Sequence, residues 1–108
     1  MFLTLQDDGV LRVYESVADA VRDVEALNAQ ETFRAVFDET GEMYAVKWIR
    51  PNKRGRLFRF MVSNGEYTLG PQNKKDVEAL LRLLRENKLV EPQGVEKRLR
   101  DLERRLTK

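Results

Sequence analysis

Residues 32–49 read TFRAVFDETGEMYAVKWI, two apolar runs joined by the turn sequence Asp-Glu-Thr-Gly. Successive side chains of a strand point to opposite faces, so Tyr44, Val46 and Trp48 share one face. Gly41 stands at the turn position where a Cβ atom is disfavoured. This stretch therefore predicts a β-hairpin with strands over 32–37 and 43–49.

Two more hairpins are predicted outside this one. The Asp-Asp-Gly sequence at 7–9 is a turn signal between strands over 2–5 and 10–15. Asn64-Gly65 is the strongest turn dipeptide in the chain and joins a strand over 57–62 to a short strand over 66–69. Gly70-Pro71 is expected to end the strand region, because proline cannot donate to a β-ladder.

Helical spacing of apolar residues predicts two helices between and after these strands. Ser16 is the expected N-cap of a helix over 17–29, and Asn73 of a helix over 74–88. The second helix has the core stripe Val77, Leu80, Leu81 and Leu84, with Leu83 as an extra contact.

A final helix is predicted over 95–106. It places apolar residues at alternating steps of four and three, the spacing of a coiled-coil seam: Val95, Leu99, Leu102 and Leu106. Two heptads are too few for an autonomous coiled coil. We therefore expect this seam either to pack on its own domain or to form a homodimer.

The predicted elements occur in the order β-β-α-β-β-β-β-α-α, over a length typical of one domain. Short turns between consecutive strands favour antiparallel pairing. We predict a single α+β domain over residues 1–108, with an antiparallel sheet of about five to six strands and the helices packed on one face. The charged C-terminal helix, within 93–108, is either appended to the domain or dimerising.

The chain contains no cysteine and no histidine. Without cysteine no disulfide or thiolate site can form, and a reducing, cytoplasmic location is expected. Without histidine the usual base near neutral pH and the usual zinc ligands are missing. The chain has no phosphate-binding glycine motif and no apolar run long enough to span a membrane. We therefore expect a protein that is not an enzyme and has no cofactor, metal site or membrane contact.

The formal net charge of +2 conceals two oppositely charged regions. Residues 1–42 carry a net charge of −7, and the remainder carries +9. Residues 43–65 contain no acid and interleave cations with aromatic residues, a composition that suits a phosphate backbone or an acidic protein. The candidate contact residues are Lys47, Arg50, Lys53, Arg54, Arg56 and Arg59.

Two other interpretations of these charges stay open. Strand alternation directs Trp48, Phe58 and Phe60 toward the core, in which case the basic residues form only a solvated face. Alternatively the contact surface is acidic and lies on the first helix, at Asp19, Asp23 and Glu25.

Residues 14–46 contain the sequences ESVADA at 15–20, VEAL at 24–27 and FRAVFDETGEMY at 33–44. This region resembles small bacterial immunity proteins of polymorphic toxin systems. The resemblance covers about a third of the chain and implies a compact α+β domain that binds and blocks a cognate toxin. It assigns no binding residue. We therefore predict a non-catalytic protein-binding domain, an immunity-like inhibitor in the finer version, with a nucleic-acid-binding module as the alternative.

Overall fold

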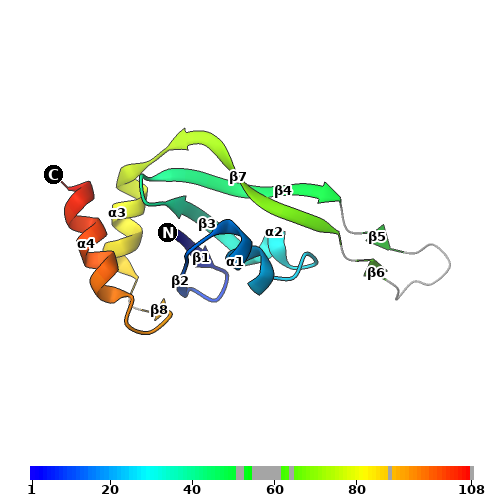
Figure 1. The fold of residues 1–108 in the computed structure, drawn as a ribbon, viewed down its shortest axis with the longest axis horizontal. Helices are drawn as coiled ribbons and strands as arrows, with labels where there is room; N and C mark the ends of the chain where they lie inside the picture. Colours follow the sequence, from blue (N-terminus) through cyan, green and yellow to red (C-terminus); the bar gives the residue numbers. More distant parts are fainter. Residues whose placement is uncertain (51–52, 55–61, 64, 88, 108) are drawn as a thin grey trace.

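The computed structural model describes residues 1–50, 53–54, 62–63, 65–87 and 89–107 (Figure 1). The strands are β1 (Phe2–Gln6), β2 (Leu11–Tyr14), β3 (Phe33–Asp38), β4 (Glu42–Arg50), β5 (Lys53–Arg54), β6 (Val62–Ser63), β7 (Glu66–Lys75) and β8 (Val90–Glu91). The helices are α1 (Val17–Asp23), α2 (Ala29–Thr32), α3 (Val77–Glu86) and α4 (Glu96–Leu106). The predicted α+β class is confirmed.

The main sheet has six strands in the order β7-β4-β3-β1-β2-β8. The two N-terminal hairpins form as predicted, with Leu3 opposite Val13 in the first. The second has Gly41 at a φ of 90°, which a residue with a side chain rarely adopts. β8 lies parallel to β2, so the prediction of a purely antiparallel sheet is wrong. β8 follows α3 and has only two residues, too few to give a periodic signal in the sequence.

One face of β1, β2 and β3 is covered by α3 and α4, an assembly that we call the closed end. Its core contains Leu3, Leu11, Val13 and Phe37 from the strands and Leu80, Leu83, Val95, Leu99 and Leu102 from the C-terminal region. Leu83 was predicted only as an extra contact, yet it is buried, whereas Leu81 is only partly buried and lies outside this core.

The opposite face of the sheet is covered by α1. Val36 directly precedes Phe37 in β3, so its side chain points to the other face of the sheet. There it packs with Ala20, Val24, Tyr67 and Leu69. The helices therefore cover both faces, and the prediction that they lie on one face is wrong. Because strand alternation in β3 buries neighbouring residues, the sheet needs a cover on each side.

The helix predicted over 17–29 is shorter in the structure. The Ser16 cap is confirmed, since its Oγ accepts a hydrogen bond from the Asp19 amide at 3.2 Å. Val24 then adopts an extended conformation and enters the core, and α2 begins only after a turn. A single buried Val24 therefore interrupts what the apolar spacing predicts as one helix.

The strand predicted over 66–69 continues as β7 to Lys75. It passes through Pro71, because β7 is an edge strand and one side of its backbone needs no ladder partner. Asn73, the expected N-cap, instead lies inside β7 with a φ of 55°. Asp76 caps α3, accepting a hydrogen bond from the Ala79 amide at 3.0 Å.

β4 and β7 extend away from α3 and α4, and the domain measures 57 × 29 × 19 Å (Figure 1). We call residues 47–50 of β4, together with Gly65 and residues 66–68 of β7, the arm. β5 and β6 pair antiparallel beyond it. Most of the strand predicted over 57–62 lies outside the described residues. No helix among the described residues is long and apolar enough to cross a membrane.

Candidate binding surface

The candidate basic residues are only partly placed by the structure. Lys47 is exposed, and its side chain lies across Gly70, where a Cβ atom would collide with Lys47 Cδ. Arg50 forms an ion pair with Glu66 at 3.3 Å. Lys53 and Arg54 are described only as backbone in β5. Arg56 and Arg59 lie outside the described residues.

The arm exposes apolar side chains as well as charged ones. Trp48 pairs with Tyr67, and Arg50 with Glu66, so Ile49 is the extra residue of a β-bulge. Ile49 is 68% exposed. Trp48 is 38% exposed although its ring lies 5.9 Å from that of Tyr67. The expectation that alternation buries Trp48 therefore holds only in part, and Phe58 and Phe60 lie outside the described residues.

A groove of about 440 Å³ separates the arm from the C-terminal turn of α1. Its apolar lining comes from Val21, Val24, Ala26, Ile49 and Tyr67. Arg22, Glu25 and Glu66 supply the charged part of the lining, and Gly65 completes it. The groove can therefore accept an apolar group while its charged side chains remain in water.

One strongly exposed hydrophobic residue, Ile49, lines this groove. The large hydrophobic side chains that are exposed in the described part of the chain are Leu27, Trp48, Ile49 and Leu89. Trp48 packs against the groove residue Tyr67, and Leu27 follows the groove residue Ala26 in the sequence. Leu89 immediately precedes β8 and is not part of the groove. Exposed apolar surface of this kind can mark an interaction site.

Two tyrosine hydroxyls hold the wall of the groove in place. Tyr67 Oη donates to the Val24 carbonyl at 2.6 Å, and Tyr14 Oη donates to Asp23 at 2.6 Å. Burial, reinforced by the charge of Asp23, raises the pKa of both hydroxyls to about 12. Both tyrosines therefore stay protonated near neutral pH and keep donating to the end of α1.

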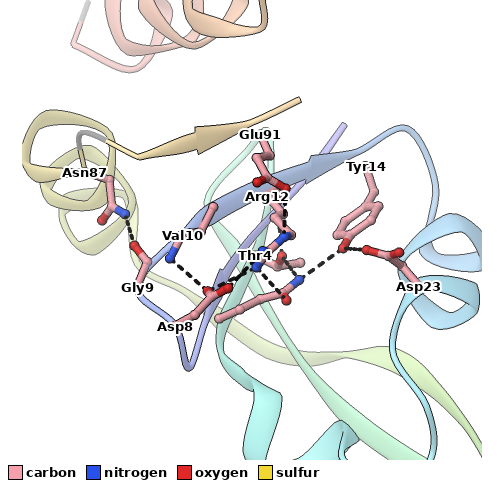
Figure 2. A network of polar contacts seen from close by, with 10 residues as sticks. Thr4, Asp8, Gly9, Val10, Arg12, Tyr14, Asp23, Asn87 and Glu91 are labelled. Carbon is pink, nitrogen blue, oxygen red and sulfur yellow. Dashed lines mark hydrogen bonds and ion pairs between the residues drawn. The ribbon is translucent and has the colours of Figure 1, made fainter. Parts of the chain in front are cut away.

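A second hollow, of about 390 Å³, lies beside α1, and we call it the polar cleft. Figure 2 shows the network behind it, in which the Arg12 guanidinium donates to Asp8, Gln6 and Glu91. The hydrogen bond that Arg12 donates to Asp8 raises the pKa of Arg12 and lowers the pKa of Asp8. Gln6 Nε2 donates to Thr4 and Tyr14, and both Thr4 and Gln6 are buried.

The candidate acidic residues are divided between the two hollows. Asp19 and Asp23 line the polar cleft, where Asp19 forms an ion pair with Arg22. Glu25 lines the groove instead. Arg22 borders both hollows, so they adjoin along one side of α1.

The predicted dimer seam packs inside its own chain. Val95, Leu99 and Leu102 are 4%, 7% and 1% exposed, and Leu106 is partly buried against the same core. These side chains cover β1–β3, and they are therefore not available to a second copy in this conformation.

The described residues contain no group of three or more carboxylate, histidine or cysteine side chains that could hold a metal ion. Within the same residues, no buried side-chain nitrogen or oxygen lacks a hydrogen-bond partner. The chemistry offered by the surface is therefore apolar contact at the groove and ion pairing or hydrogen bonding at its borders.

Sequence reasoning missed Arg12, Tyr14 and Glu91 because a motif search sees only spacing along the chain. Arg12 and Glu91 are 79 residues apart and meet through the β2–β8 pairing. It also missed Ile49, whose exposure follows from a bulge. The period-two pattern of β4 contains no signal for that bulge.

No protein-family model, curated protein or solved structure matches this chain.

Proposed function

We propose that this chain is a non-catalytic protein-binding domain and that the groove beside the arm is its contact surface. The observation that carries this proposal is a groove with an apolar lining in which Ile49 is 68% exposed. Binding energy at protein interfaces concentrates in a few buried side chains, with tryptophan, tyrosine and arginine enriched among them. Trp48, Tyr67 and Arg22 supply these residue types here.

The finer proposal is that the partner is a protein toxin. It rests on the resemblance of residues 14–46 to immunity proteins of polymorphic toxin systems. That region includes α1 and the turn with Leu27, which form one wall of the groove. A toxin encoded beside this chain is the expected partner, and co-expression of the two products would test the pairing directly.

A matched pair of variants tests the protein-binding proposal. Ile49→Asp alters the groove, and Leu89→Asp makes the same change at a residue of nearly equal exposure, 63% against 68%. The tagged full chain and both variants would be compared in quantitative affinity capture from cells. We expect a specific set of proteins to be captured by the wild type and by Leu89→Asp but lost with Ile49→Asp. Identical capture by all three chains would refute the proposal.

The alternative function is nucleic-acid binding, which the basic residues of 47–59 suggest. Fluorescence anisotropy with duplex DNA, single-stranded DNA and RNA would test it. An affinity for DNA or RNA that falls log-linearly with salt would favour this alternative. The absence of binding at low salt would eliminate it.

A further inference from the structure

The groove and the polar cleft adjoin at α1, because Arg22 borders both, and we call the two together the track. One part of the track is apolar and the other is polar. A partner that fills the track therefore has to present both kinds of side chain within one short segment.

The lining of this track is acidic. Its carboxylates are Asp19, Asp23, Glu25, Glu66 and Glu91, against the guanidinium groups of Arg12 and Arg22. Ion pairs engage Asp19, Glu66 and Glu91. Asp23 and Glu25, in contrast, form no ion pair within the described residues, and Asp23 contacts only the neutral Tyr14 hydroxyl there.

Asp23 and Glu25 are the acids of the track that remain open to a partner's cation. Elsewhere in the acidic N-terminal region, Glu15 and Glu39 are matched by Arg98 and Arg105 of α4. Asp23 and Glu25 flank Val24 in the chain, next to the apolar lining of the groove. A cationic side chain of a partner would find its complement here.

We infer that the track binds an extended segment of a partner protein that carries an apolar side chain close to a lysine or arginine. The apolar side chain lies in the groove against Ile49 and Tyr67. The cation lies beside Asp23 and Glu25. This inference rests on the proposed function and adds the chemistry of the partner, since complementary charge sets the specificity and rate of association.

A phage-displayed library of random linear peptides, selected on the immobilised full chain, is the probe. We expect the enriched peptides to combine an apolar residue with lysine or arginine. Synthetic copies would then be titrated by fluorescence anisotropy at several salt concentrations. Enrichment of acidic peptides, or no enrichment above that obtained with Ile49→Asp, would overturn the inference.

Single substitutions measure each part of the track. Ile49→Asp should weaken peptide binding about tenfold or more, because it places a charge in the apolar part. Asp23→Asn and Glu25→Gln should each weaken it about two- to fivefold at low salt, the range for exposed ion pairs. Asp7→Asn is the matched control, since it removes the same charge from an exposed turn outside the track.

The variants separate the two proposals. If Ile49→Asp abolishes binding while Asp23→Asn and Glu25→Gln behave like Asp7→Asn, protein binding at the groove stands and the cationic partner is refuted. If Ile49→Asp binds as the wild type does, both proposals fail. Glu25 is exposed and makes no ion pair in the described part of the chain, so Glu25→Gln reports on binding even if Asp23→Asn disturbs α1.

Discussion

At the closed end, Leu99 and Leu102 are 7% and 1% exposed, whereas at the arm Trp48 and Ile49 are 38% and 68% exposed. Both pairs belong to segments whose apolar spacing predicts regular secondary structure, a helix for the first pair and a strand for the second. The helices α3 and α4 cover the sheet only at the closed end (Figure 1). The contrast teaches that apolar periodicity identifies a surface that can be covered, while the tertiary arrangement decides whether the chain itself covers it.

The largest effect that tests this contrast is expected from Leu102→Ala. It should lower the free energy of unfolding by about 2–5 kcal/mol, because it leaves a cavity in the core of the closed end. Ile49→Ala should change it by less than about 0.5 kcal/mol, as exposed substitutions usually do. Urea unfolding of both variants measures the difference.

Substitutions at Leu99 and Leu102 also distinguish a core from a dimer interface. If replacing Leu99 and Leu102 by polar residues gave a folded monomer from a wild-type dimer, the seam would serve a second chain. We expect an unfolded product instead, because both leucines pack against β1–β3.

A smaller effect is expected from Tyr67→Phe, which removes a hydrogen bond between the arm and the end of α1. It removes the hydrogen bond to the buried Val24 carbonyl and should cost about 1–3 kcal/mol. Tyr44→Phe is the control, since the hydroxyl of Tyr44 lies 3.4 Å from Asp38 and its contact is weaker. Denaturation and amide exchange in α1 would measure both. Equal effects of the two variants would show that the Tyr67 hydrogen bond does not hold the groove wall in place.

The cap of α3 provides a third, more local test at the closed end. Asp76→Ala should destabilise the protein by about 1 kcal/mol, because the Ala79 amide loses its acceptor. Asp101→Ala removes an acid from the exposed face of α4, where its contact with Arg104 is 3.9 Å long, and should have little effect. Thermal unfolding would rank them, and a larger loss for Asp101→Ala would contradict the capping role.

The smallest effect concerns acid. Hydrogen bonding to Arg98 lowers the pKa of Glu15, so the folded protein holds this carboxylate ionised more strongly than the unfolded chain does. The resulting stability is complete above the ordinary value of about 4.5 and is lost as the pH falls through the lowered pKa. Arg98→Gln should reduce this pH dependence, and Arg100→Gln should not. Urea unfolding midpoints, measured from neutral pH to pH values below the pKa of free glutamate, would show this pH dependence. Added salt should reduce the difference between the two variants.

Local signals predicted much of the fold. The turns at Gly9 and Gly41 and the cap at Ser16 depend on neighbouring residues, and the structure contains all of them. The continuation of β7 through Pro71 was missed because whether a strand lies at an edge depends on the whole sheet. The parallel β8 was missed because its pairing joins Leu11 to Val90, which no local pattern encodes.

The candidate surface was less predictable than the fold. Composition indicated charged contacts, and the structure places Asp23 in the polar cleft and Glu25 in the groove. Composition could not show that an ion pair neutralises Asp19, or that a bulge exposes Ile49 beside Val24. These properties arise from tertiary contacts among residues that are distant in sequence.

The core of the closed end joins residues from both ends of the chain, and this affects how the protein folds during synthesis by the ribosome. The groove residues, the last of which is Tyr67, emerge before α3, β8 and α4, whereas Leu3 and Leu11 belong to a core that includes Leu99 and Leu102. Contacts across so much of the chain are slow to form, because a long loop has to close first. A nascent chain that ends at residue 76 thus carries every groove residue but leaves Leu3, Leu11 and Phe37 without their helical cover, the kind of apolar surface that chaperones shield.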